Sequence, residues 1–563
     1  MTQVASPEAI LCEFDGVELK AGKRTYNLER RGDEFWVEMD DPSSDSQSEY
    51  RPRIERKVVM TTGSHHQQMY WLGDEGDRKV QYLPFTYLTK EKRWITRDAS
   101  FLSPPHRKRT PQNGTWNIGC KNCHATHGRT KLTGSFSEYQ TSSMDTQTAE
   151  LGIACEACHG PGQAHVEANR DPLRRYKLHL SDQPDTTIVH PGRISHTRSS
   201  QICGQCHSIN FLPSTDELSY WSEHGYRYRP GDDLSETRFV FQLNQNLDAP
   251  IRAQVLSDPA FVRDHFWSDG MVRVSGREYN GLLETPCYQR GELSCLSCHV
   301  MHKTDDDPRP LVEWANDQLN HTMEGNGACL QCHQQYESDE ALAAHTHHSA
   351  TSTGSSCYNC HMPHTTYGLL KAIRSHQIDI PNAETQQLVG RPNACNLCHL
   401  DKTLDWTADH LYDWYDIQKP LLAKDDREIA SSILWILRGD AGQRALAAWS
   451  MGWQPAQQAS GTDWMAPHLS NLLVDPYDAV RIVAGRTLRT LPSFADFTYD
   501  DAGSAKQRND AAKRVVKQWG SSRPAGDSFR GRPLLFDANG ERNVKEIVRL
   551  LRKRDHRIVH LKE

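Results

Sequence analysis

The chain has 563 residues, a formal net charge of −7 and 37% hydrophobic residues. Its length allows two to four domains, but a mean hydropathy of −0.72 leaves little apolar material for their cores. The negative charge argues against a nucleic-acid partner, and no run of about 18 apolar residues predicts a transmembrane segment.

Residues 1–105 are predicted to form a small antiparallel β unit. Residues 26–39 have the pattern of a strand, a turn and a second strand, with Arg-Gly-Asp at the turn. Alternating aromatic and polar residues continue through residues 58–85, and a second turn signal stands at residues 73–77.

The pentapeptide Cys-x-x-Cys-His occurs seven times between residues 120 and 399. It is the attachment site of a c-type haem, in which both thiols bond the porphyrin and the histidine ligates the iron. Chance would give roughly 0.02 such pentapeptides, so we interpret the chain as a multihaem c-type cytochrome. The motif cysteines are Cys120, Cys123, Cys155, Cys158, Cys203, Cys206, Cys295, Cys298, Cys329, Cys332, Cys357, Cys360, Cys395 and Cys398. The proximal histidines are His124, His159, His207, His299, His333, His361 and His399.

Other interpretations of paired cysteines fit this pattern less well. A zinc site needs a second ligand pair and does not require a histidine directly after the second cysteine. A thioredoxin-like motif would occur once, and structural disulfides would not repeat an inner spacing of two with a trailing histidine. Cys12 and Cys287 stand outside the motifs, and the sequence leaves open whether they form a disulfide.

Residues 106–402 are predicted to be one haem domain. Seven sites in about 280 residues leave roughly 40 residues for each haem, too few for separate domains. We therefore expect the haems to share one packed body, with short helices, many loops and little sheet. A hairpin is expected at residues 270–279, in the longest gap between motifs.

Of 28 histidines, the 21 outside the motifs are candidates for the sixth iron ligand. Such an excess is typical of bis-histidine haems, which are six-coordinate and suited to electron transfer. The glycines at 160 and 162 permit a sharp reversal that would bring His165 over a neighbouring haem. For each candidate, the alternative is a surface or packed histidine without iron. The distal candidates are His165, His376, His345, His348, His65, His66, His190, His196, His302 and His364.

Residues 403–563 are predicted to form a HEAT-like α-helical domain. Cysteine disappears, and residues 427–438 and 478–491 place apolar residues at the spacing of one helix face. Residues 475–492 have the pattern of one HEAT-type repeat, and because such repeats bury their faces by stacking, two or three helix pairs are expected. A plain helical bundle is the alternative.

Four segments carry a resemblance to a known family. They are CEACHGPGQAH at 155–165, CYNCHMPHTTYG at 357–368, RSH at 374–376 and RPNACNLCHLDK at 391–402. These segments resemble the multihaem cytochromes with doubled CxxCH motifs, which often carry a HEAT or tetratricopeptide tail and are distantly similar to hydroxylamine oxidoreductase-type haem cores. The resemblance implies bis-histidine haems stacked in pairs, with His165 and His376 as axial ligands. It also implies an eighth haem motif ahead of the β unit in a longer natural protein.

The sequence thus predicts a mixed fold, mainly α and loop, with a small β unit, a multihaem core and a helical tail. The favoured function is electron transport between redox partner proteins. The alternative is a multihaem oxidoreductase acting on a small nitrogen or sulfur compound at one open haem. Because c-type haem is attached outside the cytoplasm, we expect a periplasmic or extracellular protein whose signal peptide was lost by truncation or a late start. Assembly into a homo-oligomer stays open.

Overall fold

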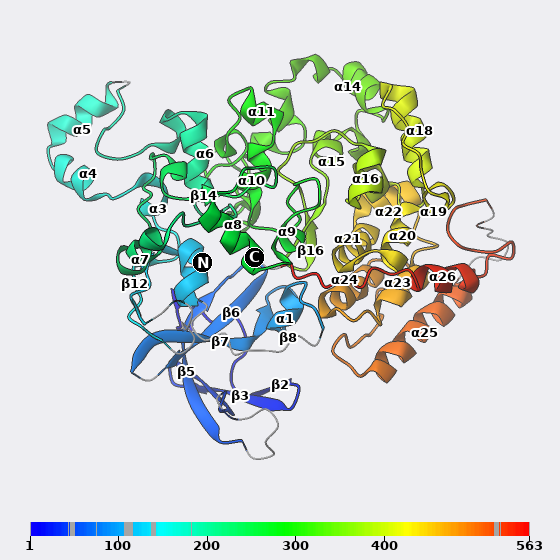
Figure 1. Ribbon diagram of the computed structural model, residues 1–563, viewed down its shortest axis with the longest axis horizontal. Helices are drawn as coiled ribbons and strands as arrows, with labels where there is room; N and C mark the ends of the chain where they lie inside the picture. The colour runs from blue at the N-terminus through cyan, green and yellow to red at the C-terminus, as the bar shows by residue number, and fades with distance from the viewer. Residues whose placement is uncertain are drawn as a thin grey trace.

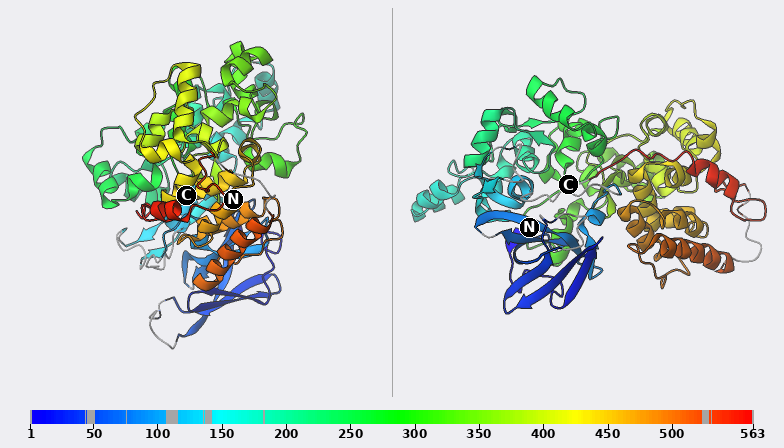
Figure 2. Two further views of the ribbon diagram at one scale, coloured as in Figure 1. Left: turned by 90° about the vertical axis from the view of Figure 1, so that its right-hand side faces the viewer. Right: turned by 60° about the horizontal axis from the view of Figure 1, so that its bottom comes forward.

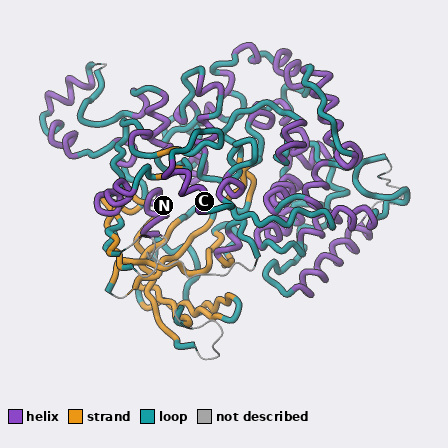
Figure 3. The backbone as a smooth tube through the Cα atoms, in the orientation of Figure 1, coloured by secondary structure: helices purple, strands orange, loops and turns teal. Residues whose placement is uncertain are grey.

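A computed structural model describes residues 2–42, 44, 51–74, 76–105, 116–134, 136, 142–181, 183–522, 529 and 531–561. Helices account for 41% of it and strands for 18%, so the mixed, helix-rich content is confirmed. Figure 1 shows the N-terminal strands at the bottom, the middle of the chain above them, and the C-terminal helices at the right. Figure 3 shows that most strand residues gather in one place, while loops dominate the middle of the chain.

The N-terminal part forms one antiparallel sheet of eight strands. Neighbouring strands follow in chain order from β2 to β8, and β1 pairs with β5. The strands are β1 (Thr2–Val4), β2 (Val17–Ala21), β3 (Arg24–Arg31), β4 (Glu34–Asp40), β5 (Arg53–Thr62), β6 (Gln67–Asp74), β7 (Asp77–Leu88) and β8 (Arg93–Thr96). The short helix α1 (Arg97–Ser100) follows β8.

The hairpin predicted at residues 26–39 is confirmed. Arg31 at the end of β3 lies opposite Glu34 at the start of β4. Gly32 in the turn has a φ of 65°, which glycine adopts without steric strain. Leu28 and Val37 lie opposite each other and are both buried, because alternate residues of a strand point to the same face.

The middle of the chain consists of short helices, long loops and two-stranded ribbons, as expected. The main helical elements, beside five further 3₁₀ turns, are η1 (Trp116–Cys120), α2 (Lys121–His124), α3 (Glu156–His159), α4 (Gln163–Ala168), α5 (Pro172–His179), α6 (His196–Gly204), α7 (Thr215–His224), α8 (Ala249–Ser257), α9 (Phe261–His265), α10 (Glu278–Leu283), α11 (Pro286–Gln289), η5 (Cys295–Ser297), α12 (Leu311–Asp317), α13 (Gly327–Leu330), α14 (Asp339–Thr346), α15 (Cys357–His361), α16 (Ala383–Val389) and α17 (Ala394–Cys398). The ribbons pair β9 (Ala125–Arg129) with β12 (Gln147–Leu151), β10 (Leu132–Thr133) with β11 (Ser143–Met144), β13 (Asn210–Phe211) with β14 (Phe239–Val240), and β15 (Thr366–Gly368) with β16 (Lys371–Ile373).

The hairpin expected at residues 270–279 is wrong. Val272 forms a bridge with Phe266, and Val274 forms a parallel bridge with Tyr367, nearly a hundred residues away in sequence. The next residues enter α10 instead of a second strand. Both Val274 and Tyr367 are buried, so tertiary packing prevails over the local turn signal of the glycines.

The C-terminal part is helical, as predicted. Its helices are α18 (Leu404–Tyr415), α19 (Lys424–Glu428), α20 (Ser431–Arg438), α21 (Ala441–Gly452), α22 (Gln454–Ser460), α23 (Ala466–Leu469), α24 (Asp478–Leu488), α25 (Ala505–Ser522) and α26 (Val544–Leu551). Figure 2 shows them beside the N-terminal sheet, where Arg93 of β8 bonds Asp501 at 2.8 Å. Among the described residues, no helix combines the length and the apolar character needed to cross a bilayer.

Hydrophobic burial is very unevenly distributed along the chain. Between residues 429 and 491, 28 apolar side chains are buried. The structure describes every residue from 289 to 366, and the buried apolar side chains in this segment are only Trp314, Ala328 and Leu342. The second segment contains three complete Cys-x-x-Cys-His motifs. Its order therefore depends on something other than apolar side chains, since a few such residues do not offset the loss of chain entropy.

Candidate functional site

Each Cys-x-x-Cys-His motif is wound into a helical turn. In the second motif, the backbone N–H of His159 donates to the carbonyl of Cys155 at 2.9 Å. The same bond closes the motifs that end at His207, His299, His333 and His399, at 2.8–2.9 Å. Residues at i, i+3 and i+4 share one face of such a turn. Both thiols and the imidazole of a motif therefore face the same way.

Four motif histidines face a second histidine from another part of the chain. The four second histidines are all among the distal candidates named from the sequence. Their role as iron ligands stays a prediction, but the structure brings each pair together. The ring-centroid separations are 6.2 Å for His159 and His302, 6.3 Å for His299 and His376, 6.2 Å for His361 and His345, and 6.0 Å for His399 and His348.

These separations match two imidazoles that bind one metal ion from opposite sides. A histidine nitrogen bonds a metal ion at about 2 Å, which places the two ring centroids about 6 Å apart. Directly stacked rings lie closer, as His347 and Trp414 do at 4.3 Å. A porphyrin supplies four nitrogens, so two imidazoles complete a six-coordinate iron. The donor set of each pair therefore fits a bis-histidine haem.

Hydrogen bonds at Nδ1 hold several of these imidazoles in place. A carbonyl oxygen only accepts, so in each bond Nδ1 carries the proton and Nε2 keeps its lone pair. Outer bonds of this kind fix the tautomer and orientation of metal-binding histidines. The bonds run from His159 to the Val189 carbonyl at 2.8 Å, from His299 to that of Asp317 at 3.0 Å, from His361 to that of Asp379 at 2.8 Å, and from His348 to that of Thr346 at 2.6 Å.

Burial also keeps members of these pairs uncharged. It lowers the pKa of His399 to about 4, and it holds the pKa of His299 and of His376 below the ordinary value. In the first motif, burial lowers the pKa of His124 to about 4. Since the neutral imidazole is the form that binds metal ions, these side chains are in the ligating form near neutral pH.

Neighbouring motifs contact one another. Thiol contacts join the first motif to the third, the third to the fourth, and the fifth to the sixth. Hydrogen bonds from side-chain amides join the second motif to the third and the fourth motif to the fifth. The thiol contacts are Cys123 Sγ to the Cys206 carbonyl at 3.6 Å and the neighbouring thiols of Cys203 with Cys295 and of Cys329 with Cys357. The amide bonds are Gln205 to the Ala157 carbonyl at 2.9 Å and Gln331 to that of Ser297 at 3.3 Å.

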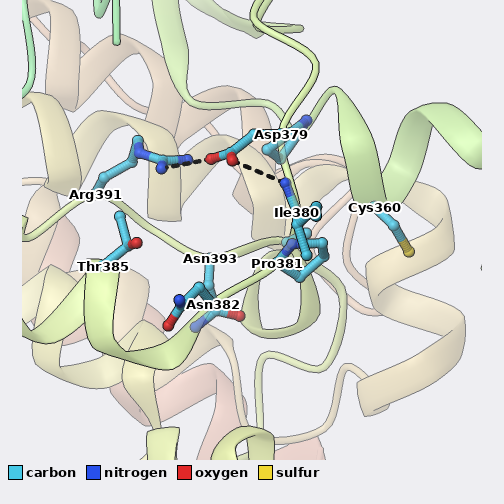
Figure 4. Close-up of a pocket in the computed structure, with 10 residues that line it drawn as sticks. Cys360, Asp379, Ile380, Pro381, Asn382, Thr385, Arg391 and Asn393 are labelled. Atoms are coloured by element: carbon cyan, nitrogen blue, oxygen red, sulfur yellow. Dashed lines mark hydrogen bonds and ion pairs between the residues drawn. The ribbon is translucent and has the colours of Figure 1, made fainter. Parts of the chain in front are cut away.

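A small pocket lies between the sixth and seventh motifs (Figure 4). Cys360 lines it from α15, and Asn393 lines it from the start of α17. Figure 4 shows Arg391 facing Asp379, and its guanidinium bonds Asp379 at 2.8 Å and Asp269 at 2.9 Å. Because the Asp379 carbonyl accepts from the sixth-motif imidazole, these ion pairs stabilise the segment that orients that ring.

The other distal candidates lie among different partners. His165 Nδ1 is 3.1 Å from an Asp185 carboxylate oxygen, a contact that leaves Nε2 unused. Within the described residues, none of these six candidates makes a ring contact with a motif histidine. Beside the contact of His165, their neighbours are Ser64 for His65, Lys371 for His66, the Gly192 N–H for His190, Tyr288 for His196, and Trp449 and Trp453 for His364.

The third motif differs from its neighbours. His207 Nδ1 donates to Oε2 of Glu278 at 2.7 Å, so its partner is a carboxylate and not a main-chain carbonyl. Burial by itself raises the pKa of Glu278. The hydrogen bond from His207 and the positive charge of that imidazole have the opposite and larger effect, so the pKa of Glu278 lies well below its usual range. In the part of the chain that the structure describes, His124, His207 and His333 make no ring contact with a second histidine.

Neither cysteine outside the motifs is in a disulfide. Cys12 lies in the β unit, where the Tyr70 hydroxyl donates to its sulfur at 3.1 Å, and Cys287 lies in α11. Within the ranges that the structure describes, no group of three or more His, Cys, Asp or Glu side chains is arranged to hold a metal ion.

The sequence did not reveal the partners of the Nδ1 atoms. Four of them are main-chain carbonyls, which any residue can supply, and Glu278 lies 71 residues after His207. One regularity was available: the acceptor follows the motif histidine by 18 residues both at His299 and at His361. No family model, curated protein or solved structure matches the chain. The functional interpretation therefore rests on the motifs and their geometry.

Proposed function

We propose that the chain is a multihaem c-type cytochrome that carries electrons between redox partner proteins. The observation that carries this proposal is the set of four histidine pairs at 6.0–6.3 Å, each containing the histidine of a Cys-x-x-Cys-His motif. A motif that arose for another purpose has no reason to place a second imidazole at the separation that iron ligation requires.

The residues of each motif have distinct tasks. Each cysteine S–H would add across a vinyl group of the porphyrin, with sulfur bonding one carbon and hydrogen the other, which would fix the cofactor covalently. In the four paired motifs, the motif histidine and the second histidine would both hold the iron through Nε2. Main-chain carbonyls at Nδ1 hold the rings in position. When bound, haem supplies an iron that accepts and releases single electrons.

The contacts between motifs support electron transport over a distance. Thiol contacts link the first, third and fourth motifs, and an amide bond continues from the fourth motif to the fifth. The fifth and sixth motifs again meet through their thiols. Cofactors attached at these cysteines would lie close together, so that an electron could pass along the protein in short steps.

The poor apolar core of residues 289–366 also supports covalent cofactors. Small or core-poor segments in proteins rely on disulfides, metal ions or other cross-links to stay ordered. A porphyrin bonded to two cysteines and one or two histidines provides both apolar area and cross-linking. Because such attachment takes place outside the cytoplasm, the proposal includes a periplasmic or extracellular location.

A second candidate is an oxidoreductase that acts on a small nitrogen or sulfur compound. The carboxylate on His207 favours it, because one motif then differs from the rest in its electronic surroundings. Substrate binding requires an open iron position, which a bis-histidine haem lacks.

One experiment separates the two candidates. The chain is exported with a signal peptide in a host that attaches c-type haem, and the purified protein is studied by electron paramagnetic resonance and by carbon monoxide titration. An electron carrier shows low-spin bis-histidine signals and takes up no stoichiometric carbon monoxide after reduction. Binding of one carbon monoxide for each chain, with turnover of hydroxylamine, nitrite or sulfite, supports the oxidoreductase instead.

A further inference from the structure

Four motif histidines have a described hydrogen-bond partner at Nδ1, and these partners are of two chemical kinds. His159, His299 and His361 donate to main-chain carbonyls. His207 donates to the carboxylate of Glu278 at 2.7 Å, the shortest of these four bonds. A carbonyl is a neutral acceptor, whereas a carboxylate carries a full negative charge and forms a stronger bond to an N–H.

The carboxylate of Glu278 is fixed at both of its oxygens. While Oε2 accepts from His207, Oε1 accepts from the backbone N–H of Gly276 at 2.9 Å. Only 27% of the side chain is exposed. A carboxylate held on both sides cannot rotate away from the imidazole without losing a second hydrogen bond, so the contact belongs to the folded structure.

The helix that carries Glu278 is docked on the third motif. The backbone N–H of Tyr279 donates to the His207 carbonyl at 2.9 Å, and that of Ile209 donates to Asn280 Oδ1 at 2.7 Å. The Tyr279 ring lies so close to Gly204, between the two motif cysteines, that a Cβ there would come within 2.6 Å of it. The first turn of α10 and the motif therefore form one rigid unit.

We propose that Glu278 is a positioning residue that makes the iron at His207 the most reducing one in the chain, an inference that rests on the proposed function. A carboxylate on Nδ1–H draws the proton toward itself and increases the electron density that Nε2 donates. A more strongly donating ligand stabilises the ferric state relative to the ferrous state. The haem of the third motif is then the last to be reduced.

The third motif contacts three other motifs, so a low reduction potential at its iron would affect electron transfer among them. Its Cys206 contacts the first motif, where the carbonyl accepts from the Cys123 thiol and the thiol lies 3.8 Å from the Asn122 carbonyl. Its Cys203 contacts the fourth motif, and Gln205 bonds the second motif. It is therefore the junction of three other motifs. If the iron at this junction is the most reducing one, an electron that passes from the first motif to the fourth must first move to a site of higher free energy. This step limits the rate of electron transfer until the neighbouring haems are reduced.

The test compares the holoprotein with Glu278→Gln, which removes the charge and keeps the size of the side chain. The matched control is Glu284→Gln, which makes the same chemical change at an exposed carboxylate at the end of the same helix, α10. Potentials are measured by spectroelectrochemical titration. In Glu278→Gln, we expect about a tenfold change in the ferric-to-ferrous ratio of one haem at fixed potential, about 59 mV upward for one electron. Glu284→Gln should leave all potentials within a fraction of that shift.

Two further results keep the inference separate from the proposed function. If haem analysis finds no covalent haem, the proposed function fails and the inference fails with it. If all haems are present and Glu278→Gln shifts no potential, or no more than the control does, the inference alone is overturned. If Glu278→Gln does not fold, Glu278→Asp is measured in its place. Because this variant keeps the negative charge, the potential of the most reducing haem should stay near its original value. An upward shift as large as that expected for Glu278→Gln overturns the inference.

Discussion

The motif-bearing segment and the C-terminal helices are ordered by different means. In residues 429–491, apolar side chains from α20, α21 and α24 are buried against one another. In residues 289–366, three complete motifs are accompanied by only three buried apolar side chains. The C-terminal helices can be stabilised by hydrophobic burial. The motif-bearing segment has few such side chains, and the proposed thioether and iron bonds would cross-link it instead.

The largest expected effect comes from withholding haem. In protein produced without haem attachment, we expect limited proteolysis to cut first within residues 289–366, while residues 429–491 stay protected. The reason is that the motif segment loses its cross-links, whereas the helices keep their apolar core. Mass spectrometry of the fragments measures the order of cleavage. Equal protection of both segments in the haem-free protein would remove the distinction between them.

A second prediction concerns adjacent histidines in one loop. His348 faces His399 at 6.0 Å, whereas His347 lies on Trp414 at 4.3 Å. His348→Ala should convert one haem from low spin to high spin, because its iron loses an axial ligand. His347→Ala is the matched control and should leave the low-spin signals unchanged. Electron paramagnetic resonance distinguishes the two, and a spin change in the His347 variant alone would reverse the assignment.

The third prediction tests whether the C-terminal helices are stabilised independently. Arg444 forms two bonds to Asp475, at 2.7 and 3.1 Å, and Asp475 is fully buried. Arg444→Met should lower the free energy of unfolding by about 3 kcal/mol, because it leaves a buried carboxylate without its main partner.

The control for Arg444 is an exposed ion pair in the same region. Lys424 lies 3.8 Å from Glu428, with both side chains more than half exposed. Lys424→Met should change the free energy of unfolding by less than about 0.5 kcal/mol. Chemical denaturation followed by circular dichroism measures both variants. Neither should alter the haem absorption spectrum, and a spectral change in Arg444→Met would show that the two regions are coupled.

The smallest effect concerns pH. Burial lowers the pKa of His468 in α23 from 6.5 to about 3. Above pH 6.5, the imidazole is neutral in both states and contributes no pH dependence. As the pH falls from 6.5 toward 3, the unfolded chain binds a proton that the folded chain does not, so stability falls, by about 2 kcal/mol between pH 7 and pH 5. His468→Gln should weaken this acid dependence, as denaturation midpoints at the two pH values would show.

Regular patterns in the sequence predicted the outer parts of the fold well. The strand alternation around Gly32 and the apolar periodicity of residues 427–438 both depend on neighbours a few positions apart. The hairpin forms, and α20 forms within the second segment, although the chain leaves helical geometry at Ile429 and Ala430. The hairpin at residues 270–279 failed because Val274 pairs with the distant Tyr367. Local turn signals do not reveal such a partner.

The candidate site shows the same limit. The seven motifs and a pool of distal histidines could be named from the sequence, and four of that pool lie opposite motif histidines. The sequence could not say which histidine faces which, because pairing joins segments as far apart as His159 and His302. It also could not identify Glu278, which has no motif of its own and acts only through its contact with His207.

The central claim is that the seven motifs hold covalent haem, and the mass of the intact exported protein tests it most directly. The account predicts a mass increase equal to seven haems, with the fourteen motif cysteines protected from alkylation and Cys12 and Cys287 still reactive after unfolding. A protein that reaches the periplasm in a host that attaches c-type haem, yet has the mass of the bare chain and sixteen reactive cysteines, would contradict it.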